Sequence, residues 1–366
     1  MTDPKIPARA LLLLPGGFAL LAGLDAALVL LGLPAPVETA RLADAHGVLL
    51  VLGFVGTVVA LERAVAAGRA LGYLAPAALG LGAILLVSPV GRTVAATLLL
   101  IGTVGLLALY LPLWRRSADI AVLIQAGGAV LATGAALLWL AAVPVPDLIG
   151  WLSGFLILTI AGERLELARV TALSFRTEAV LAGLAAAFIV GALAALLWPA
   201  PGYPVLGATL LVMTGWLAWH DIARRTVRAT GLPRYMAVCL LAGYCWLLVP
   251  AALWLLTGRI STGPGYDAIV HAVMLGFVMS MIMAHAPVIL PAVIRHPLPY
   301  TPAMYVPVIL LHASLLLRIA VGDARDIEGA VQIGGVLNII AVLGFIAVAV
   351  YSATRRTSRG SRRVTA

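Results

Sequence analysis

Two histidines near the ends of separate apolar stretches are the residues whose type and spacing most clearly allow chemistry. His46 opens the stretch 45–62, and His271 lies about one turn into the stretch 267–293. If both stretches are membrane-spanning helices, a rise of about 1.5 Å per residue brings the two imidazoles to similar depth. Two neutral imidazoles at one depth on different helices can hold a b-type haem as axial ligands. The alternative is that each ring hydrogen-bonds a carbonyl group or an interfacial water.

A second group of ionisable residues is expected at the opposite ends of the apolar stretches. The group consists of Glu62, Glu163, His285 and His312. Carboxylates and imidazoles together can bind a second cofactor, either another haem or an iron, copper or zinc ion, and they can also accept protons. Because Arg63 and Arg164 directly follow the two glutamates, ion pairs that anchor the helices at the interface are a third interpretation. His285 follows His271 by fourteen residues, which in an α-helix predicts imidazoles on one face about 21 Å apart.

Three of the apolar stretches share a short pattern that suggests an internal repeat. In the second, sixth and tenth stretches, an ionisable residue follows nine positions after the glycine of a Gly-Phe pair. The three matches are Gly53-Phe54 with Glu62, Gly154-Phe155 with Glu163, and Gly276-Phe277 with His285. Spacing of the matches by four stretches predicts three quasi-equivalent units of four helices each. The expected units are 10–114, 119–222 and 234–353.

The elements that must position these residues follow from the composition. The chain of 366 residues is 63% hydrophobic and 11% charged, with a mean hydropathy of +1.09, so it lacks the polar residues that a soluble surface requires. The apolar runs are continuous rather than alternating, which favours helices over a β-barrel. We therefore expect an all-α polytopic membrane protein with a single transmembrane domain over 1–366. Its twelve expected spans are 10–33, 45–62, 72–90, 94–114, 119–143, 147–168, 178–198, 203–222, 234–257, 267–293, 302–321 and 328–353.

The placement of arginine predicts the orientation of these spans. Connections that follow the even-numbered stretches carry most of the arginines, as does the basic tail 354–366, whereas the alternate connections carry few. The positive-inside rule then predicts that both termini and the tail are cytoplasmic, in a bacterial-type inner membrane. These segments account for much of the formal charge of +9, and no nucleotide-binding motif occurs in a supporting context. Membrane lipid is therefore the expected partner, rather than nucleic acid or a nucleotide.

The arrangement of twelve helices in three groups of four resembles subunit I of the haem–copper oxidase superfamily. The residues His46-Gly47-Val48-Leu49 are similar to that family's second-helix motif for a low-spin haem, and His271 fits its partner on helix ten. The segment from His271 to His296 is most similar to NnrS-type membrane proteins. These are smaller relatives described as containing haem and copper and associated with nitric oxide stress in denitrifying bacteria. The region 147–164 contains no histidine, so the copper-site motif of the oxidases is missing.

The residues and the resemblance together lead to a functional prediction. We expect haem b between His46 and His271, and redox or gas-ligand chemistry with nitric oxide or oxygen. A haem-dependent oxidoreductase of this kind lacks the standard copper site and needs an electron donor as a partner. Two other classes stay open. One is a proton- or metal-coupled transporter that uses Glu62, Glu163 and His285, and the other is a structural or assembly protein without a cofactor.

Overall fold

The computed structural model describes residues 7–89, 91–168 and 173–362, and its elements over these ranges are helices, with no strand. Hydrocarbon offers no partner for backbone N–H and C=O groups, so the apolar segments satisfy them within helices. In these ranges, twelve helical segments are long and apolar enough to cross a membrane. They are Ala8–Leu30, Arg41–Ala67, Ala70–Val87, Arg92–Ser117, Ile120–Leu140, Val145–Ala168, Phe175–Leu197, Pro199–His220, Gly231–Thr257, Gly263–Ile294, Pro302–Arg325 and Glu328–Thr354. The expected all-α, multi-pass architecture is confirmed.

Several spans consist of more than one helical element. The elements of the first half are η1 (Ala8–Leu12), α1 (Leu13–Leu30), α2 (Ala40–Val48), η2 (Leu49–Gly56), α3 (Thr57–Ala67), η3 (Ala70–Tyr73), α4 (Leu74–Val87), α5 (Arg92–Ser117), α6 (Ile120–Leu140) and α7 (Val145–Ala168). The elements of the second half are α8 (Phe175–Leu197), α9 (Pro199–His220), α10 (Ala223–Thr226), α11 (Gly231–Thr257), α12 (Gly263–His271), η5 (Ala272–Met279), α13 (Ser280–Ile294), η6 (Pro302–Met304), α14 (Tyr305–Leu316), η7 (Leu317–Gly322), η8 (Asp323–Arg325) and α15 (Glu328–Arg362).

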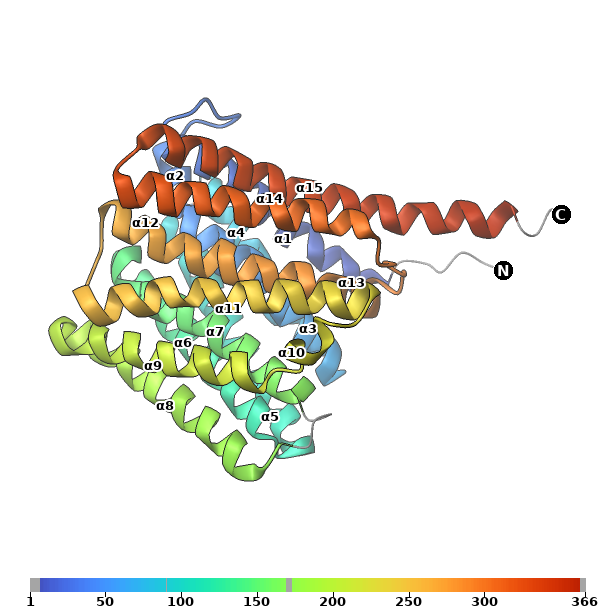
Figure 1. The fold of residues 1–366 in the computed structure, drawn as a ribbon, viewed down its shortest axis with the longest axis horizontal. Coiled ribbons are helices and arrows are strands. Elements are labelled where there is room, and N and C mark those ends of the chain that lie inside the picture. Colours follow the sequence, from blue (N-terminus) through green and yellow to red (C-terminus); the bar gives the residue numbers. More distant parts are fainter. Residues whose placement is uncertain (1–6, 90, 169–172, 363–366) are drawn as a thin grey trace.

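The spans lie side by side in one bundle, with α14 and α15 along one edge and α8 and α9 along the other (Figure 1). Because the number of spans is even, η1 and the C-terminal part of α15 lie at the same end of the bundle. We call this the terminal end, and the opposite end the distal end. The common side of the two ends agrees with the charge-based expectation. The side of the membrane that the terminal end faces stays a prediction.

The sixth span is the most enclosed of the twelve, with 78% of its apolar window buried. This span is α7, and α6 packs closely against it because glycines take the place of larger side chains. A Cβ atom on Gly128 would lie 2.8 Å from the carbonyl oxygen of Phe155, and one on Gly162 would lie 2.6 Å from that of Ala121. Small residues of this kind let helix backbones approach in a membrane. The close approach brings the polar C-terminal part of α7 into the interior.

The second and tenth spans both contain a π-helical segment of eight residues, η2 and η5. The Gly-Phe pair occupies the same place in each: Gly53 is the fifth residue of η2, and Gly276 is the fifth residue of η5. Around Gly154 the sixth span is regular α-helix, so the likeness extends to two of the three matched spans. Arrangement in three quasi-equivalent units stays a prediction. Since η5 lies between His271 and His285, their spacing does not follow the regular α-helical geometry that we expected.

The backbones of α9 and α11 approach closely at Gly207, which provides a test of the fold. A Cβ atom on Gly207 would lie 2.4 Å from the backbone nitrogen of Leu255 and 2.7 Å from the carbonyl oxygen of Ala251. Backbone atoms cannot rotate away as a side chain can, so Gly207→Ala should force the helices apart and destabilise the protein by about 1–3 kcal/mol. Gly215→Ala on the same helix is the control, because its Cβ would meet no atom within 4 Å. Thermal unfolding in detergent should separate the two variants, and equal midpoints would contradict this packing.

Candidate functional site

His46 lies at the distal end, in the last turn of α2 and just before η2. Thr39 caps the start of α2 by accepting a hydrogen bond from the backbone nitrogen of Leu42 at 3.3 Å. The imidazole Nδ1 lies 2.9 Å from the carbonyl oxygen of Gly23 on α1, and a carbonyl oxygen can only accept, so Nδ1 carries the proton. Within the described part of the chain, Nε2 has no hydrogen-bond partner. The ring is therefore held by one nitrogen and presents the lone pair of the other.

His271 is the last residue of α12, directly before η5, and its ring is held in the same way. Nδ1 lies 2.9 Å from the carbonyl oxygen of Asp267 and 3.2 Å from the Oδ1 atom of the same residue. Arg318 in η7 fixes that carboxylate with two hydrogen bonds, from Nε to Oδ2 and from Nη2 to Oδ1, each of 2.7 Å. No described residue hydrogen-bonds Nε2 of His271. The side chain is 17% exposed, so it is partly enclosed in the bundle.

The two imidazoles, on the second and tenth spans, lie close enough to interact electrostatically. His46 interacts electrostatically with His271, and also with Arg318 and Asp267. The spans themselves pack against each other through α3 and α13, nearer the terminal end. Each of the π-helical segments η2, η5 and η7 adjoins or contains one of these residues, and such segments are common at functional sites. Two imidazoles whose Nε2 atoms have no hydrogen-bond partner among the described residues thus lie on different helices at the distal end.

A second polar cluster lies toward the terminal end, around the guanidinium of Arg63. Arg63 donates hydrogen bonds to the Glu62 carboxylate and, at 2.9 Å, to Oε1 of Gln125 on α6. Its Nη2 atom also lies 4.0 Å from Oε1 of Glu163 on α7. Two glutamates from different spans therefore share one arginine. The cluster combines the two carboxylates expected from sequence with the ion pairing that formed the alternative interpretation.

Arg164 and Asp221 form a buried ion pair next to this cluster, with side chains 4% and 1% exposed. The arginine donates from Nε to Oδ2 at 2.8 Å and from Nη2 to Oδ1 at 2.7 Å. Tyr244 adds a hydrogen bond of 2.6 Å to Oδ2, and the backbone nitrogen of Ala223 adds one of 2.8 Å to Oδ1. Burial acts to raise the pKa of Asp221, but the hydrogen bonds from Arg164 and then Tyr244 bring it below its ordinary value.

His285 joins this ion pair, whereas His312 does not. The Nδ1 atom of His285 donates to the carbonyl oxygen of Met281 at 2.7 Å, and Nε2 accepts from Nη1 of Arg164 at 3.1 Å. His312 accepts at Nδ1 from the indole nitrogen of Trp246 at 2.9 Å, and its Nε2 lies 3.3 Å from Oγ of Ser280, five residues before His285. Both ring nitrogens of each histidine are thus engaged by protein groups. Among the described residues, no group of three or more His, Cys, Asp or Glu residues could hold a metal ion.

Several residues of the two sites were not predicted from sequence. Arg318 and Asp267 each carry a charge inside an apolar stretch, which is a signal that sequence reasoning can use. His220 and Asp221 are adjacent at the end of the eighth apolar stretch. In the structure His220 stacks on Trp216 with ring centroids 4.5 Å apart, while Asp221 turns inward to Arg164. Chain position alone cannot predict that the two adjacent side chains point in different directions. The directions differ because α9 ends at His220 and the backbone of Asp221 is extended.

Comparison with protein families adds one finding. Residues 9–354 match the model of a family described as "Domain of unknown function (DUF8744)". The match covers most of the chain and nearly all of the transmembrane domain. No curated protein matches the sequence.

Proposed function

This chain belongs to the DUF8744 family, and we propose that it binds haem b between His46 and His271 at the distal end of the bundle. One observation carries the proposal. Each imidazole is bound through Nδ1 to a carbonyl oxygen, which leaves the two Nε2 lone pairs free on different helices. Haem-ligating histidines use this arrangement, because a hydrogen bond to the other ring nitrogen fixes the tautomer and the orientation of the ring.

The groups that contact the Nδ1 atoms of the two imidazoles are of the kind that support metal ligands. The Gly23 carbonyl oxygen orients His46, and the backbone carbonyl and carboxylate of Asp267 near Nδ1 orient His271. Arg318 neutralises the carboxylate, so the negative charge is balanced within a largely apolar environment. Oriented imidazoles and a charge-balanced set of contacts behind them support the proposal of haem binding at this site.

The proposed ligand set defines the type of chemistry. Bound haem supplies one-electron redox chemistry. Since His46 and His271 would fill both axial positions, neither is left for nitric oxide or oxygen, and electron transfer is the role that we propose. Gas-ligand chemistry would require one imidazole to leave. If the positive-inside rule holds, the distal end is outside the cytoplasm, and an electron partner approaches from that side.

The direct test is an absorption spectrum of the full chain, expressed with sufficient haem and purified in detergent. We expect a Soret band that sharpens and shifts on reduction with dithionite, with about one haem b per chain by extraction. Carbon monoxide should leave the reduced spectrum nearly unchanged, because both axial positions are filled. A colourless protein under haem-replete expression would overturn the proposal, and a large carbon monoxide shift would overturn the electron-transfer role.

A second candidate function, proton- or cation-coupled transport, is favoured by the cluster at the terminal end. The Glu163 side chain is 16% exposed, and among the described residues its ion pair is with Arg63, at 4.0 Å. A largely buried carboxylate whose ion pair is long is suited to take up and release a proton. Under this alternative the purified protein carries no haem, and ion flux into proteoliposomes depends on Glu163.

A further inference from the structure

A cavity of about 360 Å³ opens at the terminal end, between the start of α11 and the segment that joins α13 to α14. Its lining residues are Thr230, Gly231, Arg234, Val238, Tyr300 and Tyr305. The cavity is separate from the histidine pair, which lies at the distal end of the bundle. It is also separate from the clusters around Arg63 and Arg164, since none of their members lines it.

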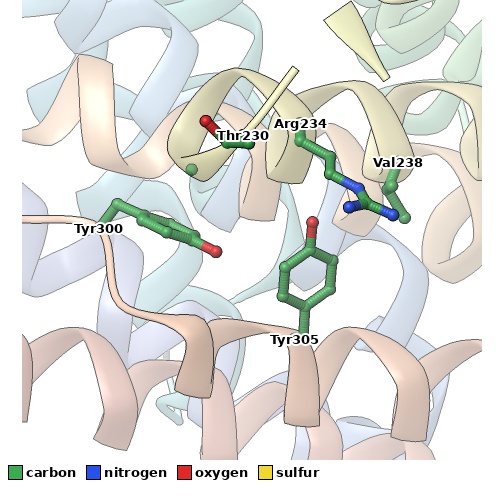
Figure 2. A pocket seen from close by; sticks show the side chains of 6 residues that line it. Thr230, Arg234, Val238, Tyr300 and Tyr305 are labelled. Atoms are coloured by element: carbon green, nitrogen blue, oxygen red, sulfur yellow. The ribbon is translucent and has the colours of Figure 1, made fainter. Parts of the chain in front are cut away.

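The polar groups of the cavity are suited to an anion. Figure 2 shows the guanidinium of Arg234 and the hydroxyl of Tyr305 directed toward each other, with the hydroxyl of Tyr300 directed into the same space. Arg234 is exposed and has no hydrogen bond or ion pair with a described residue. No carboxylate is among the lining residues. The guanidinium and the two phenols together offer several donors and a net positive charge.

The first turn of α11 adds to this character. The helix begins at Gly231, and the side chain of the N-cap residue Thr230 makes no capping hydrogen bond. Backbone N–H groups in the first turn of a helix have no partner within the helix, and the macrodipole of this 27-residue helix is positive at this end. Phosphate groups bind at such termini, and a cationic side chain beside the terminus adds a charged donor. Here that side chain is Arg234, on the same turn.

The aromatic residues of the cavity are held in place by a buried third ring. Tyr235, which is fully buried, packs against Tyr300 with ring centroids 5.7 Å apart and against Tyr305 edge-to-face at 5.2 Å. Tyr300 and Tyr305 belong to a different segment of the chain from α11. Their contacts with Tyr235 fix the distance between the two sides of the cavity, so the donors need little rearrangement to bind a ligand.

We propose that the Arg234–Tyr300–Tyr305 pocket binds a phosphate group that carries a net negative charge. Phosphate accepts several hydrogen bonds at once and pairs with guanidinium in a planar, two-point geometry. The pocket lies where spans begin, so one source is the head group of an anionic phospholipid, for which basic pockets between membrane helices are a known environment. A soluble phosphate is the other source, and the experiment below distinguishes the two.

The test uses the full chain, purified and delipidated in a neutral detergent. Binding of phosphatidylglycerol, of zwitterionic phosphatidylcholine and of inorganic phosphate is measured by native mass spectrometry and by the shift in thermal midpoint. We expect saturable binding of phosphatidylglycerol well above that of phosphatidylcholine. Arg234→Gln should weaken it by about tenfold, the effect of losing one charge-assisted contact. Tyr305→Phe, which keeps the ring, should weaken it by about threefold.

The control is Arg295→Gln, which removes the same charge from an exposed arginine at the same end but outside the pocket. Its affinity for phosphatidylglycerol should stay within about twofold of the unmodified chain. If inorganic phosphate raises the thermal midpoint as much as the lipid does, and Arg234→Gln reduces both effects equally, the ligand is a soluble phosphate. Equal weakening by Arg234→Gln and Arg295→Gln would overturn the proposal, as would equal binding of the two lipids. If Arg234→Gln does not fold, the affinity of Tyr305→Phe for phosphatidylglycerol tests the proposal in its place.

Discussion

His46→Ala and His271→Ala should each remove the low-spin haem spectrum, although the two residues lie in helices separated by more than two hundred positions in the chain. The proposed coordination needs both Nε2 atoms, and alanine at either position leaves one axial ligand missing. Substitution of a residue behind a metal ligand already costs about 10–100-fold in affinity, so loss of the ligand itself should cost more. The measurement is the ratio of Soret to protein absorbance after purification, together with extracted haem per chain.

His312→Ala is the matched control for these variants. His312 also lies inside a span, and its ring is engaged by Trp246 and Ser280. Its removal should leave the Soret band in place while slightly lowering stability. Elution as a single symmetrical species shows in each case that the variant folds. Retention of the full low-spin spectrum in both His46→Ala and His271→Ala would exclude the proposed ligand pair.

Much of the architecture could be predicted from the sequence, because the physical cause is local. A continuous apolar run must form a helix in hydrocarbon, so the number of spans and the common side of the termini follow from composition and length alone. The expectation that His46 and His271 lie at similar depth rests on their distance to the ends of their spans. Both predictions depend on counting residues along single helices, and neither depends on how the helices turn toward each other.

The partners of the ionisable residues could not be predicted in the same way. Asp267 and Arg318 are 51 residues apart, and Arg164 and His285 are 121 residues apart. Such contacts depend on the rotation of each helix about its axis. The π-helical segment η5 changes that rotation within the tenth span, and no residue type in the segment announces it. Depth alone places His312 with His285 in the expected group. In the structure, the His312 ring instead contacts Trp246 on α11.

Arg164→Met should be among the most destabilising substitutions in the chain. It leaves the Asp221 carboxylate buried without a cation and removes the donor to Nε2 of His285. Loss of one partner of a buried, hydrogen-bonded ion pair costs about 3–5 kcal/mol, because the remaining charge stays desolvated. Unfolding in detergent by increasing sodium dodecyl sulfate, followed by circular dichroism, measures the change in the free energy of unfolding.

The stability lost in Arg164→Met should depend on pH, in a direction set by the pKa of Asp221. In the native protein the pKa of Asp221 is below its ordinary value, because hydrogen bonds from Arg164 and Tyr244 outweigh burial, so its stabilising contribution is present at neutral pH and is lost on acidification. In Arg164→Met the main opposing contact is gone, and burial should raise that pKa above its value in the unfolded chain. Protonation of Asp221 then removes the unpaired buried charge from the variant. The difference in stability between the two proteins should therefore shrink as the pH falls from about 8 to about 5.

Two further variants separate the buried charge from other effects of the substitution. Arg164→Met combined with Asp221→Asn removes the uncompensated charge but keeps an oxygen that accepts from Tyr244, so it should recover a large part of the lost stability. Arg259→Met breaks an ion pair of 2.6 Å with Asp147, whose side chains are 46% and 29% exposed. An exposed pair contributes about 0–1 kcal/mol, because water screens it and solvates the partner that remains. If Arg164→Met costs no more than Arg259→Met, Asp221 cannot be the buried, ionised partner of Arg164.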